Sequence, residues 1–174
     1  MILASNTLIR AQMPVTTISS IIVAFLANIG LEVSVGKISH KTFLPGIAIV
    51  SGRLLIDEHQ LKYPGDLLHE AGHLAIIPAR KRSQINVYVG EGAAEEMMAI
   101  AWSYAALVYL KLDPAIVFHH DGYHGGSESI IESFSNGRYF GVPVLQWLGM
   151  TVDEVQAKKL GVEPYPHMIK WLLD

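Results

Sequence analysis

The spacing of apolar residues changes along the chain, and these changes predict where helices and strands lie. Residues 14–30 form an apolar stretch with Pro14 and Thr16 or Thr17 as helix-start signals and Gly30 as a stop signal. Residues 31–38 alternate apolar and polar side chains, which is typical of a strand. This part of the chain is therefore expected to form a helix followed by a strand.

A second β region and a run of helices are expected after residue 45. Residues 47–56 have the pattern of two short strands joined by a tight turn at Ser51 and Gly52. Because strands and helices are grouped rather than alternating, the pattern predicts an α+β fold and not an alternating parallel sheet. The later elements expected are a helix from Pro64 or Asp66 to Ile77, a polar connector at residues 80–82, a short strand at residues 85–89, the longest helix at about residues 93–112, a loop at residues 119–126, and several short helices beyond it.

Composition narrows the class of protein. Hydrophobic residues make up 51% of the 174 residues and charged residues 17%, so the chain can bury a sizeable core and does not have the composition of a disordered protein. The net charge of −3 disfavours a surface built to bind nucleic acid, which would carry a basic face. Cysteine is absent, so any metal ion must be held by His, Asp or Glu, and the lack of disulfides favours a cytoplasmic location.

Two charge-free apolar stretches, residues 18–31 and 97–110, raise the question of membrane insertion. Both are shorter than the ~20 residues that a helix needs to cross a bilayer. At the N-terminus, Arg10 and Pro14 interrupt the early apolar run, which argues against a secretory signal. We therefore expect no membrane span, and both stretches are expected to be buried helices.

Two groups of conspicuous side chains have ordinary interpretations. Trp102, Trp147 and Trp171 lie in apolar segments and are expected in the core. The basic run at residues 80–82 could attract an acidic partner, but a solvated connector is the stronger interpretation. Neither group is assigned a function.

The strongest functional signal is the sequence HEAGH, in which His69, Glu70 and His73 have the HExxH spacing. On a helix, residues i and i+4 lie on one face, so both imidazoles can reach one metal ion. Glu70 is turned by about 100° from His69 around the helix, which lets its carboxylate reach a metal-bound water without being a ligand. Two His ligands and a Glu base are the arrangement of zinc metalloproteases, and the sequence therefore predicts a zinc site.

A catalytic zinc ion usually takes a third protein ligand, and the sequence offers several. The extended motif with a third His is absent, because Ala79 occupies its place. The next helix offers Glu91, Glu95 and Glu96, of which Glu96 is favoured because it begins a stripe of inward-facing positions. The other two acids are expected to interact with the helix dipole or to hold a His ring nitrogen. The stripe consists of Glu96, Ile100, Ser103 and Leu107.

A Gly- and His-rich loop at residues 119–126 is the remaining candidate. His119 or Tyr123 could donate a hydrogen bond to the oxyanion of a tetrahedral intermediate if this loop lies over the metal. A second metal bound through His120 and His124 is an alternative, although the neighbouring glycines disfavour a fixed ligand geometry. An ordinary polar surface loop is equally consistent with the sequence.

The order of these motifs resembles a known group of enzymes. HEAGH, preceded by GRLLIDE and followed by EMMAIAW, resembles the gluzincin branch of the zincin metallopeptidases, and especially the small cytoplasmic ImmA/IrrE-type enzymes. The resemblance covers about residues 45–110. It implies a zinc-dependent endopeptidase with His69 and His73 as ligands and Glu70 as base.

The same resemblance implies a domain organisation. We expect one zincin-like domain over residues 1–174, with a core at about residues 31–112 and a helical extension at about residues 113–174. In the core, a small β-sheet or hairpin is expected to pack on the HExxH helix and on a long second helix. The extension resembles nothing that could be named.

Two hypotheses of function remain. The first is a zinc-dependent metallohydrolase, most simply a peptidase, in which Glu70 activates zinc-bound water to attack a peptide or protein substrate. The second is a zincin-fold binding or regulatory module whose metal site is structural or vestigial. The intact Glu70 favours the first, because a structural site needs no base beside its ligands. The oligomeric state is not predicted by either.

Overall fold

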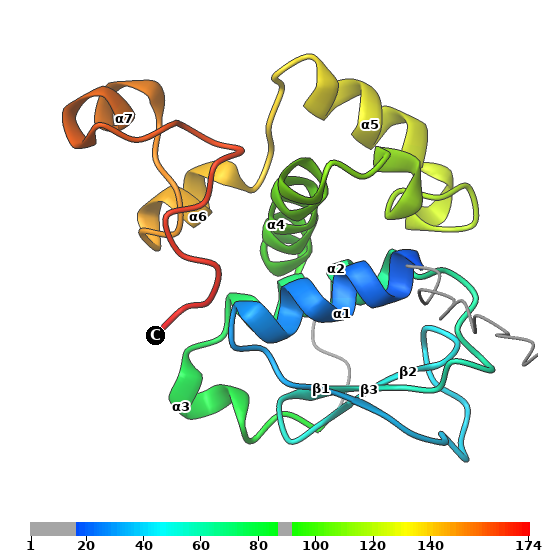
Figure 1. Cartoon of the computed structure of the whole chain (residues 1–174). Helices are drawn as coiled ribbons and strands as arrows, with labels where there is room; N and C mark the ends of the chain where they lie inside the picture. Colours follow the sequence, from blue (N-terminus) through cyan, green and yellow to red (C-terminus); the bar gives the residue numbers. More distant parts are fainter. Residues whose placement is uncertain (1–16, 87–91) are drawn as a thin grey trace, which may run out of the picture.

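A small β-sheet with helices stacked on one of its faces forms the described part of the chain, residues 17–86 and 92–174, in this computed structural model (Figure 1). Strands and helices are grouped as the α+β prediction requires. The elements are α1 (Ile18–Asn28), β1 (Val33–Val35), β2 (Ile47–Val50), β3 (Arg53–Ile56), α2 (Asp66–Ala75), α3 (Ala79–Arg82), α4 (Ala93–Leu110), α5 (Ser127–Ser135), α6 (Val142–Trp147) and α7 (Glu154–Leu160), with short 3-10 turns at Pro114–Ile116 and Tyr123–Gly125.

The three strands form one mixed sheet in the order β1-β3-β2. β2 and β3 are the predicted hairpin, with Ile47 opposite Ile56. Ser51 and Gly52 both have positive φ, at 50° and 71°, as a two-residue turn between twisted strands requires. β1 runs parallel to β3 and is shorter than the strand expected over residues 31–38.

The first helix is fixed at both ends by its sequence. The side chain of Thr17 accepts a hydrogen bond from the Ser20 amide, and the Ser20 side chain accepts one from the Thr17 amide. This capping box confirms Thr17 as the start signal. Gly30, with φ of +88°, follows the last turn and confirms the predicted stop.

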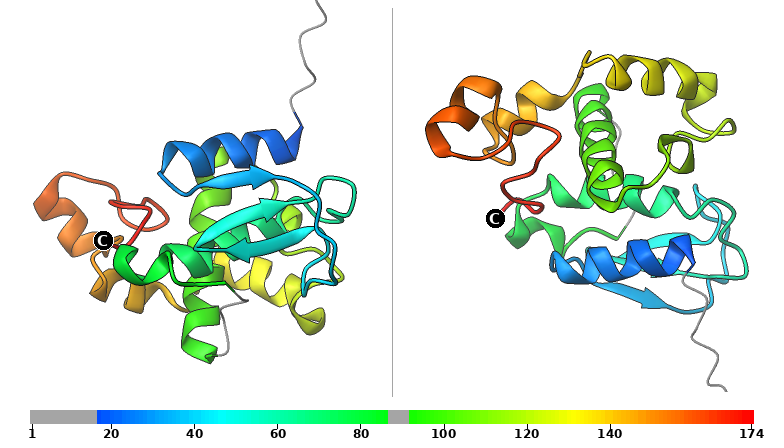
Figure 2. Two further views of the ribbon diagram at one scale, coloured as in Figure 1. Left: turned by 90° about the horizontal axis from the view of Figure 1, so that it is seen from below. Right: turned by 45° about the horizontal axis from the view of Figure 1, so that its top comes forward.

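The HExxH helix lies at the centre of the molecule. α1 and α2 cover the same face of the sheet, and α4 lies on the other side of α2 from the sheet (Figures 1 and 2). Every residue of α2 is buried as a result. Neighbouring apolar side chains from all three layers join in one core, which includes Ile22, Leu54, Leu68 and Trp102.

The long helix α4 confirms the predicted element to within two residues at its end. Ile100, Ser103 and Leu107 are buried, as expected of the stripe that Glu96 begins. The Ser103 hydroxyl lies 2.7 Å from the Ala99 carbonyl oxygen and 3.2 Å from that of Leu68, so it joins α4 to α2. The register of α4 against α2 is therefore set by side chains next to the candidate site.

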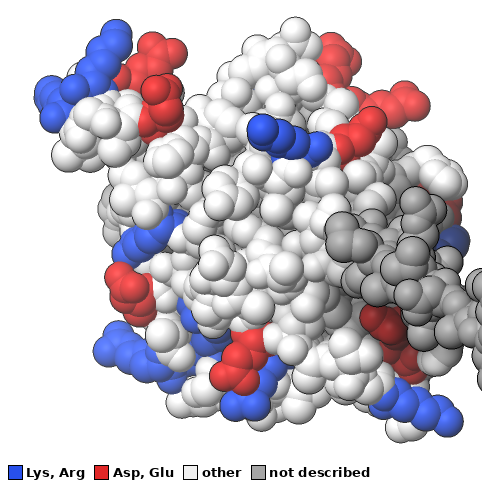
Figure 3. Space-filling model, viewed as in Figure 1, with Lys and Arg blue, Asp and Glu red and all other residues white. Residues whose placement is uncertain are grey.

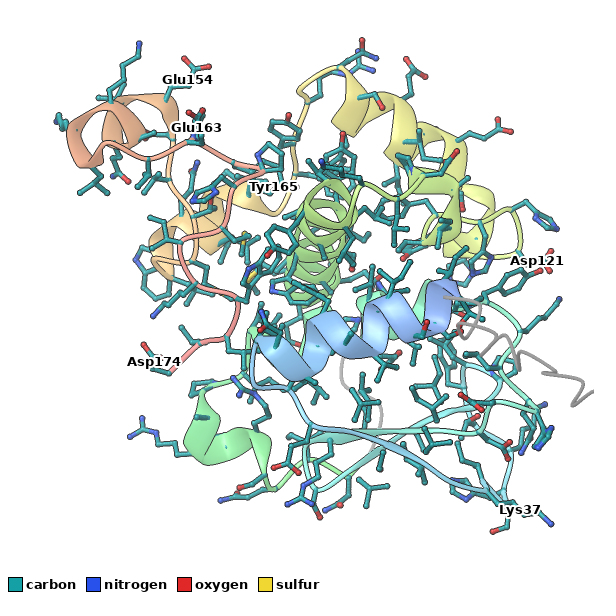
Figure 4. The ribbon with its side chains drawn as sticks, viewed as in Figure 1. Lys37, Asp121, Glu154, Glu163, Tyr165 and Asp174 are labelled. Atoms are coloured by element: carbon teal, nitrogen blue, oxygen red, sulfur yellow. The ribbon has the colours of Figure 1, made fainter. Side chains whose placement is uncertain are left out.

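The last residues of the chain return to the end of α2 (Figure 1). The Leu173 amide donates to the Ala75 carbonyl at 2.8 Å, and the Trp102 indole donates to the Trp171 carbonyl at 2.9 Å. Asp174 lies close to α3 in the view of Figure 4. The helical extension thus packs back onto the helices that carry HExxH and Glu96.

The prediction of a solvated connector at residues 80–82 is wrong for Arg82. These residues form the last part of α3, and the half-buried Arg82 side chain donates hydrogen bonds to three carbonyl groups at 2.8–2.9 Å. Arg80 and Lys81 are exposed as predicted. A guanidinium group has five N–H donors, so one side chain can satisfy several carbonyls at a helix end. The three acceptors are Leu74, Ile77 and Leu173.

Two smaller expectations also need correction. Trp147 is 83% exposed at the end of α6, whereas Trp102 is fully buried as predicted. The described part of the strand expected at residues 85–89, Ile85 and Asn86, is not in a strand. It contacts the β2–β3 turn instead, since the Gly52 amide donates to the Ile85 carbonyl at 2.8 Å.

The remaining expectations concern membrane insertion and the two apolar stretches. Within residues 17–86 and 92–174, no helix is both long and apolar enough to cross a bilayer. On the face shown in Figure 3, acidic and basic side chains lie around the periphery, and the middle of the face carries few charges. The apolar stretches beginning at residues 18 and 97 form α1 and most of α4.

Candidate metal centre

His69 and His73 project from one face of α2, as the HExxH spacing predicts. Their Nε2 atoms lie 3.1 Å apart, and the two rings are nearly perpendicular. Both side chains are buried, His73 almost completely. Two nitrogen atoms thus point into one small volume.

Glu96 completes this group from the first turn of α4. Its Oε1 lies 3.6 Å from His69 Nε2, and its Oε2 lies 3.2 Å from His73 Nε2. These three residues are the only group of three or more potential ligands that the structure brings together within its described residues. Of the other acids considered, Glu95 is exposed, and Glu91 lies outside the described residues.

Burial controls the protonation of the His69 imidazole. It lowers the pKa of His69 to about 4, helped by the neighbouring His73 and opposed by the charge of Glu96. His69 is therefore neutral at pH 7 and has a nitrogen lone pair to offer. Contact with the two His side chains lowers the pKa of Glu96, in spite of its partial burial. The group thus combines two imidazoles and an ionised carboxylate.

Glu70 lies next to this group and is buried without compensation. Its side chain is 3% exposed, and its Oε1 atom has no hydrogen-bond partner among the described residues. Burial, together with the charges of Asp66 and Glu96, raises the pKa of Glu70 to about 8 in the metal-free protein. A cation held by the neighbouring ligands would oppose this shift.

The loop at residues 119–126 lies beside the candidate metal group. The Tyr123 hydroxyl is 3.1 Å from Nδ1 of His69, on the side of the ring away from the cluster. His119 is partly buried, and its Nε2 is 2.9 Å from Oδ1 of Asp66. The structure therefore brings both residues to the first turns of α2, and their role as oxyanion donors stays a prediction.

The other two His residues of this loop are arranged differently. His120 is exposed, and its Nε2 lies 3.1 Å from Asp121. His124 is exposed as well and lines the same cavity as Glu96. In the described chain the two are not part of a group of potential ligands like that of His69.

Two residues of the site were missed by the sequence analysis. Asp66, at the start of α2, is buried and accepts a hydrogen bond from His119. Tyr63 stacks on the ring of His119, with centroids 3.7 Å apart, and its hydroxyl contacts Asp121. Asp66 could have been noticed, because it lies one turn before Glu70 and on the same helix face. Nothing in the sequence pairs Tyr63 with a loop more than fifty residues away.

Two adjoining cavities open beside the group. The larger, of about 650 Å³, is lined by His69, Glu96 and Tyr123. The smaller, of about 190 Å³, is lined by Glu70 and by strand β2. Phe43 lines both and is 73% exposed between them. The cleft made by these two cavities thus reaches two of the predicted ligands, His69 and Glu96, and the predicted base, Glu70.

The distances within the group can be compared with what a metal ion requires. Zinc bonds of about 2.0–2.1 Å in a tetrahedron place neighbouring ligand atoms roughly 3.3–3.4 Å apart. The two Nε2 atoms here are 3.1 Å apart, and each lies near a different oxygen of Glu96, at 3.6 Å for His69 and 3.2 Å for His73. Two imidazoles and one carboxylate also leave one tetrahedral position open, as catalytic zinc sites do. The residues present fit a zinc ion.

The chain matches no protein-family model, no curated protein and no solved structure. The arguments for function therefore rest on the geometry of the site.

Proposed function

We propose that this protein is a zinc-dependent metallohydrolase of the zincin type, most simply a peptidase. The observation that carries the proposal is the convergence of His69, His73 and Glu96 beside the buried, unpaired carboxylate of Glu70. The three side chains come from two helices, α2 and α4, that are mostly buried. A metal ion explains why ionisable side chains meet there.

Each residue has a separate task in the proposed reaction. His69, His73 and Glu96 hold the ion, and a bound zinc ion supplies the acidity that lets water attack an amide carbonyl at neutral pH. Glu70 takes a proton from the attacking water and passes it to the leaving amine. The fold supports this division, because one face of α2 carries both His ligands while Glu70 is turned towards the smaller cavity.

The shape of the cleft favours a peptide substrate. The two cavities meet at Phe43, one containing Glu70 and the other His69 and Glu96, so an extended chain can place side chains on both sides of the reacting bond. The larger cavity has the size of a typical ligand site, roughly 300–1,000 Å³. His119 and Tyr123 line it and remain our candidates for donors to the developing oxyanion.

A library of peptides with varied sequences, analysed by mass spectrometry, tests the proposal without a known substrate. We expect the zinc-loaded protein to cleave a subset of these peptides and the Glu70→Gln variant, loaded with equal zinc, to cleave none. The variant keeps the shape of the side chain and removes only its capacity to carry a proton to the amine.

The alternative function, a binding or regulatory module, gives a different result. A module with a structural metal retains zinc but cleaves no peptide, and Glu70→Gln then has no effect. Loss of zinc from Glu70→Gln would instead identify Glu70 as a ligand and overturn the assignment of roles.

A further inference from the structure

The loop at residues 119–126 is attached to the HExxH helix and to the turn before it by several side chains. His119 contacts Asp66, and Asp121 accepts hydrogen bonds from Lys62 at 2.8 Å and from Tyr63. The Ser127 hydroxyl donates to the His119 carbonyl at 2.6 Å and closes the base of the loop. These contacts hold the loop in place but do not involve a candidate metal ligand.

Tyr123 joins this loop to a candidate ligand by a hydrogen bond. Its hydroxyl is 3.1 Å from His69 Nδ1, and the two rings are 5.3 Å apart and nearly perpendicular. The backbone is strained at this position, because Tyr123 has φ of 53°, in the left-handed region that few residues other than Gly, Asn, Asp and His adopt, and His124 follows with φ of 51°. Strain of this kind persists only where the surroundings stabilise it.

We propose that Tyr123 is a positioning residue that couples zinc binding to the docking of this loop. The inference rests on the proposed zinc site. With Nε2 of His69 on the metal, the ring proton must reside on Nδ1, and the Tyr123 hydroxyl is placed to accept it. Without the metal, His69 can carry its proton on either nitrogen, and only one of the two tautomers donates to Tyr123.

The coupling is reciprocal. A tyrosine that accepts a hydrogen bond from Nδ1 favours the tautomer whose Nε2 lone pair faces His73 and Glu96, so it increases the affinity for zinc. By the same linkage, a zinc ion on Nε2 would fix the proton on Nδ1 and make this N–H a stronger donor to Tyr123, so zinc would strengthen the contact that holds this segment against α2. This loop lines the larger cavity, so zinc binding is expected to make that wall of the cavity more rigid.

The test compares two Tyr→Phe variants by zinc titration against a competing chelator. Tyr123→Phe keeps the ring and removes only the hydroxyl at His69. Tyr165→Phe is the matched control, because its buried hydroxyl also makes one hydrogen bond, to the Ala101 carbonyl at 2.9 Å. Tyr165 lies well away from Asp121 and the loop in the view of Figure 4.

We expect Tyr123→Phe to bind zinc about 10- to 100-fold more weakly than the parent, the usual effect of removing a group that holds a metal-ligating His. Tyr165→Phe should bind as the parent does. Amide hydrogen exchange of residues 119–126 should slow when zinc is added to the parent, and slow much less in Tyr123→Phe. If Tyr123 had a purely structural role, zinc would slow exchange in this loop equally in the parent and in Tyr123→Phe.

Each contrary result has a distinct meaning. Unchanged zinc affinity in Tyr123→Phe overturns the coupling and leaves the proposed function intact. Equal weakening in both variants also overturns it, because general loosening of the fold then explains the loss. If the parent binds no zinc, the proposed function fails first and the inference falls with it.

Discussion

The carbonyl oxygen of Ala99 lies 2.9 Å from the point that a Cβ atom on Gly72 would occupy. Gly72 is inside HEAGH, and Ala99 is one turn after Glu96. The missing side chain therefore lets α4 approach α2 closely enough for Glu96 to reach both His residues. The glycine of the motif sets the position of the third candidate ligand, although it contributes no ligand atom.

Gly72→Ala should weaken both the fold and the metal site. The added methyl group meets backbone atoms of α4 that cannot rotate away, and overpacking of this kind costs about 1–3 kcal/mol. Chemical denaturation of the metal-free protein measures this loss, and zinc titration measures the displacement of Glu96. An unchanged zinc affinity would show that the position of Glu96 does not depend on the helix contact.

Glu96→Ala should reduce zinc affinity far more than Glu95→Ala. The two residues are adjacent in α4, but only Glu96 lies within 3.6 Å of the His nitrogens, while Glu95 is exposed. Chelator competition on both variants makes the comparison, and the helix-terminal charge changes equally in each. A larger loss in Glu95→Ala would refute the assignment of Glu96.

Arg82→Ala should destabilise the protein by at least about 2 kcal/mol, because it leaves three carbonyl groups without their charged donor. Lys81→Ala is the matched control, since its side chain is exposed on the same short helix. Urea denaturation should separate the two variants. Equal stability would mean that water replaces Arg82 at no cost.

The stability of the metal-free protein should depend on pH through Glu70. Its pKa rises from 4.5 to about 8 on folding, mainly because of burial, so the folded state keeps a proton that the unfolded state releases. The contribution of Glu70 to stability is present below pH 4.5 and is lost as the pH rises through 8. Glu70→Gln removes this loss.

The measurement is the free energy of unfolding of parent and Glu70→Gln at pH 6 and pH 8, with a chelator present. The advantage of the variant over the parent should be larger at pH 8. A difference that does not change with pH would contradict the raised pKa of Glu70. His69 acts at lower pH, since its lowered pKa removes stability as the pH falls from 6.5 towards 4.

Local signals in the sequence were sufficient for the elements that carry the site. Thr17 marks the start of α1 and Gly30 marks its end, and the Ser51–Gly52 turn joins β2 to β3. HEAGH lies on a helix because its apolar neighbours have helical spacing. The stripe that begins at Glu96 also predicted correctly which face of α4 is buried. This prediction was possible because helical periodicity does not depend on distant residues.

Contacts between distant segments could not be predicted in this way. The local sequence around Arg82 predicts a solvated side chain. In the structure, one of its hydrogen bonds goes to the carbonyl of Leu173, which belongs to the last residues of the chain. Trp147 is exposed at the end of α6, whereas Val142 and Leu145 of the same short helix are buried, and the run of apolar residues does not distinguish them. The contacts of Tyr123 with His69 and of His119 with Asp66 join positions more than fifty residues apart, and no spacing rule covers them.

The central claim, that His69, His73 and Glu96 hold a zinc ion, is tested most directly by elemental analysis of protein purified without a metal-affinity tag. We expect about one zinc per chain in the parent. His73→Ala, which removes the most deeply buried of the three ligands, should lose it. If His73→Ala retains as much zinc as the parent, or if the parent contains none, the proposed metal centre is contradicted.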